Sequence, residues 1–245
     1  MGYHESLTEG RNAVLEAFRS GKTVDRLFVL DGCQDGPVKT ILREAKKQDT
    51  MVQYVKKERL DQLSETKNHQ GVIAYCAACE YAEVSDILEN AKKKGEAPFI
   101  VLLDGIEDPH NLGAIIRTAN QAGAHGVIIP KRRAVGLTAT VARTSAGAVN
   151  YTPVAKVTNL VTVMEDLKKE GMWFVCEDMD GEEMYSLNLK GPIGLVIGNE
   201  GEGVSRLVKE HCDMVASIPM KGDIDSLNAS VAMGVLAYEI VRQRR

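Results

Sequence analysis

Polar side chains gather in three short turns, each of which follows an apolar run of the sequence. The first turn, DGIEDPHN, ends at Asn111, and Arg117 follows it closely. The second, GNEGEG, carries Glu200, and the third, KGDIDSLN, contains Ser226 and Asn228. Carboxylate, amide, hydroxyl and guanidinium groups together offer the hydrogen-bond donors and acceptors that bind a ligand or hold a reacting group. The three turns are therefore candidate parts of a functional site.

Each turn also has a purely structural interpretation. Asn111 is well placed to cap the helix that follows it, and Ser226 fits as the N-cap of the last helix. The apolar stripe of the first helix puts Arg117 on the opposite face, where a solvated charge is ordinary; that stripe is Leu112, Ile115, Ile116, Ala119 and Ala122. All three polar turns fall at the C-terminal ends of apolar strands, which is where open α/β sheets bind their ligands. This shared position favours one functional site formed by the three turns.

The glycine-rich turn resembles a phosphate cradle, since it joins an apolar run to an amphipathic segment. Two carboxylates, Glu200 and Glu202, stand where a phosphate would bind. GNEGEG also departs from the G-x-G-x-x-G pattern of dinucleotide sites, and no ribose-binding acid follows at the usual spacing. The turn is therefore a poor candidate for binding NAD, and we expect Glu202 to be a favourable charge in the first turn of the next helix.

Apolar runs alternate with helix-like segments along the chain, which is typical of an α/β fold. Runs at 26–30, 51–55 and 71–77 predict a small α/β domain over residues 1–80, and the charged stretch 81–97 predicts a short helix and a linker. In residues 98–245 the runs are longer and continuous, which indicates parallel strands buried on both faces. The last segment, SLNASVAMGVLAYEIVRQ, is apolar on nearly every side, so we expect it to be buried in the core or against a second subunit.

Composition narrows the class of protein. A net charge of −4 is not that of a strongly basic nucleic-acid binder, so any RNA contact depends on local patches such as KRR at 131–133, KK at 56–57 with Arg59, or the terminal RQRR. The five cysteines are scattered, and CAAC at 76–79 has no second pair at ligand spacing, so we expect no disulfide framework and no metal. With no signal-peptide pattern and no apolar run of membrane-spanning length, the expected location is the cytoplasm, with no membrane partner.

Taken together and in order, the three segments resemble the three motifs of the SpoU (TrmH-like) branch of the SPOUT RNA methyltransferases. They are DGIEDPHNLGAIIRTA, LVIGNEGEGVS and IPMKGDIDSLNASVA, within a match that covers nearly all of residues 97–243. The stretch KRRAVGLTATVARTSAGAV is similar to that of bacterial members that modify 23S rRNA. The N-terminal domain is similar, more loosely, to their small RNA-substrate-binding domain.

The resemblance implies methylation of an RNA ribose 2′-hydroxyl with S-adenosyl-L-methionine as methyl donor and no metal. It also implies a deep trefoil knot in a C-terminal α/β domain with a mainly parallel sheet, and a homodimer formed through that domain. Knots are too rare for periodicity to predict one.

The resemblance also implies roles for single residues. Arg117 matches the essential arginine and Asn111 the asparagine that positions it, while Glu200, Ser226 and Asn228 match the remaining catalytic positions. Gly198, Ile218, Met220 and Leu227 match positions whose backbone lines the cofactor pocket, and Gly198 would let that backbone approach adenosine closely. For phosphate contacts we predict Lys131, Arg132 and Arg133, together with Arg11 of the small domain.

The substrate implied is RNA, with 23S rRNA favoured because many tRNA ribose methyltransferases of this branch lack the N-terminal domain. A guanosine of 23S rRNA is the expected target. The alternatives are a tRNA ribose methyltransferase, or a non-catalytic RNA-binding or ribosome-assembly protein that kept the fold without the chemistry.

Overall fold

The computed structural model describes residues 6–223 and 226–245 and divides them into two compact units. The first unit holds the described residues up to Glu80 together with Gly136–Thr140. The second holds Tyr81–Val135 and Val141–Arg245. Each unit has its own sheet and its own apolar core, and both sheets are covered by helices, so the predicted α/β class is confirmed.

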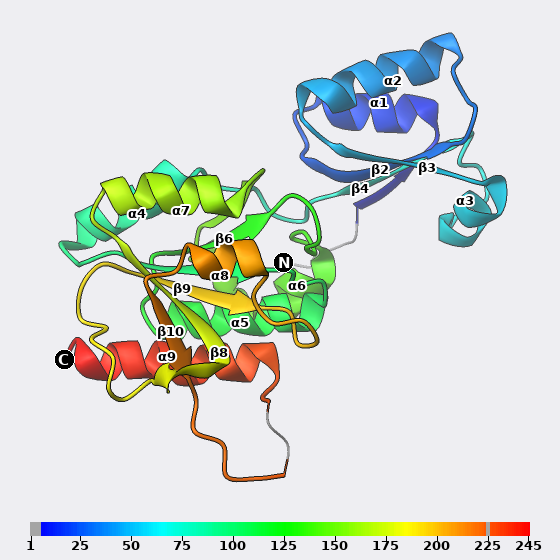
Figure 1. The fold of residues 1–245 in the computed structure, drawn as a ribbon. Helices are drawn as coiled ribbons and strands as arrows, with labels where there is room; N and C mark the ends of the chain where they lie inside the picture. The colour runs from blue at the N-terminus through cyan, green and yellow to red at the C-terminus, as the bar shows by residue number, and fades with distance from the viewer. Residues whose placement is uncertain (1–5, 224–225) are drawn as a thin grey trace. The chain divides into compact units, whose positions relative to one another are not determined.

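The first unit is a four-stranded mixed sheet in the order β1-β4-β2-β3. Strands β2 and β3 are parallel, and β4 pairs antiparallel with both β1 and β2. Helices α1 and α2 cover one face, while α3 packs Leu60 against Phe28 and Ile73 on the other (Figure 1). The elements are β1 Ser6–Glu9, α1 Arg11–Arg19, β2 Val24–Leu30, α2 Gly36–Lys47, β3 Met51–Val55, α3 Lys57–Leu63 and β4 Val72–Cys76.

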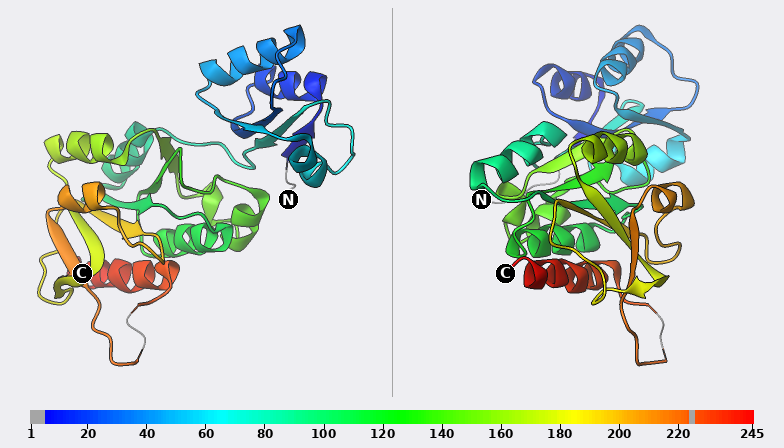
Figure 2. Two further views of the ribbon diagram at one scale, coloured as in Figure 1. Left: turned by 45° about the vertical axis from the view of Figure 1, so that its right-hand side comes forward. Right: turned by 60° about the vertical axis from the view of Figure 1, so that its left-hand side comes forward.

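The second unit is a six-stranded sheet in the order β10-β8-β9-β5-β6-β7, and every strand pair in it is parallel. Helices α4 and α7 cover one face and α5 and α9 the other (Figures 1 and 2). The elements are α4 Val84–Lys94, β5 Phe99–Asp104, α5 Pro109–Gln121, β6 Gly126–Pro130, the short 3-10 helix Ala148–Asn150, β7 Val154–Val157, α7 Leu160–Lys169, β8 Trp173–Glu183, β9 Ile193–Gly198, α8 Arg206–Glu210, β10 Met214–Ser217 and α9 Ala229–Gln243. Helix α6, Ala139–Thr144, begins in residues of the first unit and ends in residues of the second. Strand β9 is buried along its whole length, as the continuous apolar runs predict.

Residues 81–97, which the sequence suggests are a linker with a short helix, carry α4 and begin the second unit. Ile87 and Ala91 of this helix are fully or almost fully buried, and Ile87 belongs to the core that also contains Ile100 and Phe174. A side chain at Gly126 in β6 would lie 2.5 Å from Ile87. The glycine therefore makes room for the helix, and the segment packs as part of that unit.

The caps of two helices differ from the sequence-based prediction. Helix α5 begins at Pro109 with Asp108 as its N-cap, whose carboxylate accepts from the His110 N–H at 2.8 Å. Proline is favoured at the first helical position, so the helix begins before Asn111, and Asn111 is not the cap. Helix α9 is capped by Asn228, which accepts from the Ser230 N–H, and not by Ser226. Both corrections free an expected capping side chain for another role.

The last helix is not buried all round. Its inner face packs against α5 and β9 and carries Ala232, Met233, Leu236, Ala237 and Ile240, all buried. On the outer face Val231 is 49% exposed and Tyr238 is 52% exposed. The sequence leaves open whether this helix is buried in the core or against a second subunit. The core covers only one of its faces. Among the described residues, no helix combines the length and the apolar character needed to cross a membrane.

Candidate active site

The three polar turns meet at one edge of the parallel sheet. Strands β5 and β9 are neighbours, but the chain leaves β5 towards β6 on one side and leaves β9 towards β10 on the other. Such a switch point opens a crevice at the C-terminal ends of the two strands. The first turn follows β5, the second follows β9 and the third follows β10. The arrangement places the candidate residues where an open parallel sheet binds its ligands.

A hydrogen-bonded cluster joins one residue from each turn. Asn111 Nδ2 donates to Glu200 Oε1 at 2.8 Å, and Asn228 Nδ2 donates to Asn111 Oδ1 at 3.0 Å. Asn228 Nδ2 also donates to Glu200 Oε1. Asn111 is buried, whereas Glu200 and Asn228 are exposed, so the cluster has a buried base and an accessible face. The structure thus brings together three of the five predicted catalytic residues.

Ser230 is a member of this cluster that sequence reasoning missed. Its Oγ donates to Asn228 Oδ1 at 2.6 Å, and its backbone N–H donates to the same oxygen at 3.0 Å. Because both bonds engage the amide oxygen, the amide nitrogen of Asn228 is turned towards Glu200 and Asn111. The sequence contained a signal for this contact: Ser230 lies two residues after Asn228, the spacing at which an N-cap side chain accepts from a backbone N–H, and Ser230 also carries a hydroxyl.

Arg117 and Ser226 lie outside the cluster. Arg117 is exposed on α5, on the face opposite the buried stripe, as predicted. The amide groups of Asn111 bond with Glu200 and Asn228 and not with Arg117, so the structure does not show the expected positioning of the arginine by this asparagine. Ser226 is exposed on the segment before α9. Both side chains are accessible to a bound molecule.

The glycine-rich turn is closed by its own hydrogen bonds. Asn199 and Gly203 exchange two backbone bonds of 3.1 and 2.8 Å, and the Gly201 N–H donates to Asn199 Oδ1. The Ser205 N–H donates to Asp104 Oδ2 at 2.8 Å. These N–H groups are already satisfied, so they do not form an open anion cradle. The glycines of this turn therefore do not indicate a phosphate site, and the carboxylates Glu200 and Glu202 are compatible with its structure.

One detail of the turn differs from the sequence-based view, and a second gives a structural reason for Gly198. Helix α8 begins at Arg206 after the N-cap Ser205, so Glu202 lies before the helix and not in its first turn. A Cβ atom at Gly198 would lie 2.0 Å from the backbone of Gly203. Glycine is therefore required at Gly198 by the return of the chain over the end of β9, independently of any ligand.

A cavity of about 270 Å³ opens between the loops that follow β5 and β9. Its lining is Asp104, Gly105, Glu107, Arg133, Asn199, Glu202, Gly203 and Ser205. Asn199 also donates to the Gly105 carbonyl at 2.9 Å, which ties the two loops together next to Glu200. Of the predicted cationic patch, Arg133 reaches this cavity, Arg132 is exposed, and Lys131 is half-buried. A cation of the KRR segment therefore lies between the loops that follow β5 and β9, whereas Asn111, Glu200 and Asn228 are not part of the lining.

The residues expected to line a cofactor pocket lie on neighbouring segments. Gly198 ends β9, Ile218 and Met220 are half-buried on the loop that follows β10, and Leu227 is half-buried just before α9. Within the described part of the chain, no hydrogen bond uses the backbone of Ile218, Met220 or Leu227. Unpaired backbone donors and acceptors beside apolar side chains fit a ligand that combines a heterocycle with apolar surface.

Arg11, in the first unit, has partners within the protein. Its guanidinium pairs with Asp35 at 2.6 Å, and its Nε donates to the Gln70 carbonyl at 3.0 Å. A phosphate contact by Arg11 would therefore compete with Asp35.

The chain matches two family models that together account for most of its length. Residues 98–238 match the SpoU rRNA Methylase family, and residues 7–82 match the RNA 2′-O ribose methyltransferase substrate binding family. The chain belongs to the SpoU methylase family, whose members are S-adenosylmethionine-dependent RNA methyltransferases.

Relatives support the same assignment over the whole chain. A Bacillus subtilis protein, YacO, described as a TrmH family tRNA/rRNA methyltransferase, is 49% identical over 96% of this chain and 94% of its own length. A Staphylococcus aureus protein described in the same way is 43% identical over 98% and 97%.

Solved structures give the fold. The SpoU methyltransferase AviRb from Streptomyces viridochromogenes, in complex with the cofactor AdoMet, is 27% identical with a TM-score of 0.62, over 98% of this chain and 90% of that one. A TrmH/SpoU tRNA modifying enzyme from A. aeolicus is 28% identical with a TM-score of 0.55, over 64% of this chain and 84% of that one. The second unit therefore has the SpoU methyltransferase fold.

Proposed function

We propose that the protein methylates a ribose 2′-hydroxyl in RNA, with a guanosine of 23S rRNA as its target. The observation that carries this proposal is the polar cluster of Asn111, Glu200 and Asn228, which joins all three family motifs at the switch point of the sheet. The N-terminal substrate-binding match supports rRNA over tRNA, because the tRNA modifying relative covers 64% of this chain. As an RNA enzyme with free, scattered cysteines, the protein is expected in the cytoplasm.

Glu200 is proposed to accept the hydrogen bond of the ribose hydroxyl. Both amide donors of the cluster bond with Oε1, and within the described residues no donor reaches Oε2. The cluster thus fixes the orientation of the carboxylate and leaves one oxygen on the exposed face. Correct placement of reacting groups contributes on the order of 7–11 kcal/mol to such reactions.

Arg117 is proposed to bind the RNA phosphate next to the target ribose and to stabilise negative charge that develops on the attacking oxygen. A guanidinium stays protonated in proteins, so it does not serve as the general base. Ser226, exposed before α9, is proposed to donate to the bound nucleotide.

S-adenosylmethionine, when bound, supplies a methyl group on a positively charged sulfur. Gly198, Ile218, Met220 and Leu227 are proposed to hold it. The unpaired backbone groups of Ile218, Met220 and Leu227 would face the adenosine, and their half-buried side chains would contact its apolar surface. We also propose that this region carries the trefoil knot that the family resemblance implies. Among the described residues no cluster of three metal-ligating side chains occurs, and the proposed chemistry does not use a metal.

Lys131, Arg132 and Arg133 are proposed to contact phosphates of the RNA, and Arg133 lines the cavity between the loops that follow β5 and β9. Each phosphate contact adds to the salt dependence of binding, so neutralising these residues should flatten the plot of log affinity against log salt. An unchanged slope would contradict the assignment. Arg11 is a weaker candidate because Asp35 already pairs with it.

A homodimer through the second unit is proposed to cover the outer face of α9. Val231 and Tyr238 leave an apolar face exposed there, and burying such a face is favourable. Arg117 lies on α5, which packs beside α9, so the interface would bring the arginine of one copy close to the other.

Mapping ribose methylation at nucleotide resolution in 23S rRNA and in tRNA, from cells with and without the protein, tests the proposal. We expect one guanosine of 23S rRNA to lose its methyl group and to regain it with the wild-type protein but not with Arg117→Ala. A methyl group lost from tRNA instead would establish the tRNA alternative.

Two further measurements separate the remaining alternatives. A non-catalytic RNA-binding protein would show no rise in melting temperature with S-adenosylmethionine, whereas a binding-competent enzyme is stabilised by mass action. The pH–rate profile of Arg117→Lys tests the role of the guanidinium fork: substantial retained activity would contradict a role specific to it.

A further inference from the structure

Strand β8 carries a half-buried carboxylate, Glu177, at the point where its regular pairing ends. The strand lies between β9 and β10 in the sheet (Figure 1). Its pairing with β9 ends at Cys176, opposite Val196, and its pairing with β10 is interrupted after the same residue, which lies opposite Val215. Glu177 is therefore the first residue of β8 beyond both neighbours, and in parallel register it is level with the last residues of β9.

The alternation of side chains along β8 places Glu177 on the face of the sheet that α5 and α9 cover. Phe174 and Cys176 pack in the core on the other face, together with Met164 of α7. Successive side chains of a strand point to opposite faces, so Val175 and Glu177 share the second face. Val175 is fully buried there, and α9 packs against the neighbouring strand β9. Glu177 thus lies at the same end of the sheet as the glycine-rich turn.

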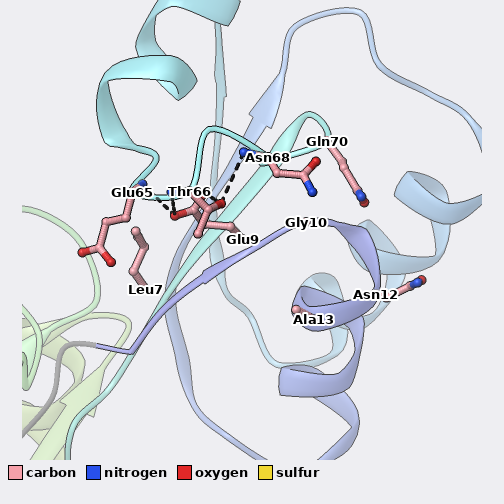
Figure 3. Close-up of a pocket in the computed structure, with 9 residues that line it drawn as sticks. All are labelled: Leu7, Glu9, Gly10, Asn12, Ala13, Glu65, Thr66, Asn68 and Gln70. Carbon is pink, nitrogen blue, oxygen red and sulfur yellow. Dashed lines mark hydrogen bonds between the residues drawn. The ribbon is translucent and has the colours of Figure 1, made fainter.

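Two other half-buried carboxylates, Glu9 and Asp178, have hydrogen-bond donors within the protein. Glu9 of the first unit accepts four hydrogen bonds from residues 64–66 (Figure 3). Burial by itself would raise the pKa of Glu9, but these bonds outweigh it and hold the pKa below its ordinary value. Asp178 accepts from Lys209 at 2.6 Å, which lowers the pKa of Asp178. Half-buried carboxylates of this chain are therefore ordinarily paired.

Glu177 departs from this pattern. Across residues 6–223 and 226–245, no hydrogen bond and no ion pair reaches its carboxylate. Burial raises the pKa of the Glu177 carboxyl, and the charge of Asp178 raises it further. Removing a carboxylate from water without giving it a donor is unfavourable, and such groups are concentrated at functional sites. The carboxylate of Glu177 is thus an acceptor for which the fold supplies no donor.

The position of Glu177 relative to the glycine-rich turn resembles that of a ribose-binding acid. In dinucleotide-binding α/β folds a glycine-rich turn follows one strand, and a carboxylate at the end of the neighbouring parallel strand accepts from a ribose hydroxyl. Here the turn follows β9, and Glu177 lies at the same end of the neighbouring strand β8. Because β8 precedes β9 in the chain, the acid comes before the glycines, and a search for an acid after them does not find it.

We propose that Glu177 accepts hydrogen bonds from the ribose hydroxyls of S-adenosylmethionine. The two vicinal hydroxyls supply the donors that the carboxylate lacks, and the carboxylate has one oxygen for each of them. The inference rests on the proposed function for the place of the cofactor beside Gly198 and Ile218, and it adds the residue that recognises the sugar of the cofactor.

Equilibrium dialysis of the full-length protein with radiolabelled S-adenosylmethionine tests the proposal. Glu177→Ala should weaken binding about 10- to 100-fold, the effect of losing hydrogen bonds to a charged group. Wild-type affinity in this variant would overturn the proposal.

Displacement of the label by adenosine and by 2′,3′-dideoxyadenosine tests the ribose contact directly. The two compounds are uncharged and differ only in the ribose hydroxyls. The wild-type protein should bind adenosine about tenfold or more tightly than the dideoxy compound, and Glu177→Ala should bind both alike. If Glu177→Ala weakens S-adenosylmethionine but leaves this preference unchanged, Glu177 responds to the positive charge of the cofactor, and the proposal is wrong.

Two variants control for charge and for folding. Glu170→Ala removes an exposed carboxylate just before the opposite end of β8 and should keep both the affinity and the preference. Glu177→Gln has nearly the same size and keeps one acceptor oxygen, so it should weaken binding less than Glu177→Ala. Its melting temperature without ligand should be at or above that of the wild type, because no partner in the protein is lost. A lower melting temperature would assign Glu177 a structural role and overturn the proposal.

Methyl transfer to 23S rRNA, measured separately, distinguishes this proposal from the proposed function. Cofactor binding that depends on Glu177, in a protein that transfers no methyl group to RNA, would contradict the proposed function and support the ribose contact. Wild-type cofactor affinity in Glu177→Ala, in a protein that methylates RNA, would overturn the ribose contact and leave the proposed function intact.

Discussion

Two glutamates, Glu9 in the first unit and Glu200 in the second, each gather hydrogen bonds from residues distant in sequence. Glu9 accepts from backbone N–H and hydroxyl donors that all belong to residues 64–66, and both of its oxygens are used. Glu200 accepts from two side-chain amides on two different turns, and both bonds fall on one oxygen. One carboxylate has hydrogen bonds from a single loop on both oxygens. The other is held through one oxygen, and among residues 6–223 and 226–245 no donor reaches its second oxygen.

The difference teaches what each carboxylate is built to do. A carboxylate whose acceptors are all satisfied contributes to stability and holds a shape. A carboxylate that is held on one side and accessible on the other is arranged to meet a further donor, as an active site requires. We therefore expect loss of Glu200 to affect chemistry and loss of Glu9 to affect folding, and four predictions test this contrast.

The largest effect is expected from Glu200→Ala. It removes the exposed acceptor and leaves the amides of Asn111 and Asn228 without their common partner, so the rate of methyl transfer should fall by about 10²–10³-fold. Single-turnover transfer from radiolabelled S-adenosylmethionine to rRNA measures the rate. The melting temperature should fall less than in Glu9→Ala, because Glu200 is exposed and accepts two hydrogen bonds whereas Glu9 accepts four. Glu202→Ala, a carboxylate of the same turn outside the cluster, is the control, and an equal loss in both variants would contradict the prediction.

Glu9→Ala should lower the free energy of unfolding by about 1–3 kcal/mol, because it leaves the donors of residues 64–66 without their acceptor. Chemical denaturation of the full-length protein, with unfolding of the first unit followed, measures the loss of free energy. Glu16→Ala, which removes an exposed carboxylate from α1 of the same unit, should be nearly neutral. A change of the same size in both variants would mean that Glu9 does not anchor the loop.

Stability should also depend on acid through Glu9. Its pKa is lowered in the folded protein, so its stabilising contribution is complete above the pKa of the unfolded chain, about 4.3 for glutamate. The contribution is then lost as the pH falls through the lower folded pKa. Glu9→Gln should therefore lose less stability than the wild type between about pH 5 and pH 3. Parallel denaturation curves at these pH values give the comparison, and identical acid losses would refute it.

The smallest effect is expected from Ser230→Ala. The hydroxyl is one of two donors that fix the Asn228 amide, so its loss should reduce kcat about three- to tenfold with KM for RNA unchanged. Ser230→Thr keeps the hydroxyl and should restore most of the rate. A rise in KM without a fall in kcat would show that Ser230 does not act by orienting Asn228.

Much of the architecture could be predicted from local pattern. Continuous apolar runs predict the buried parallel strands, and the period of the stripe on α5 places Arg117 on its exposed face, because a side chain's direction repeats every two or 3.6 residues. Helix boundaries were less predictable. Helix α5 begins at Pro109 with Asp108 as its N-cap, and not at Asn111. The boundary was hard to predict because several neighbouring residues could act as the cap.

The sequence by itself determined which residues are polar at the ends of apolar strands, and the family resemblance selected Asn111, Glu200 and Asn228 among them. Tertiary structure decided that these residues bond with one another across 89 and 117 positions of the chain, because such contacts depend on strand order and not on local period. It also decided that the glycine-rich turn satisfies its own N–H groups and that α9 buries one face. Each of these outcomes depends on which segments the fold brings side by side, which no local pattern specifies.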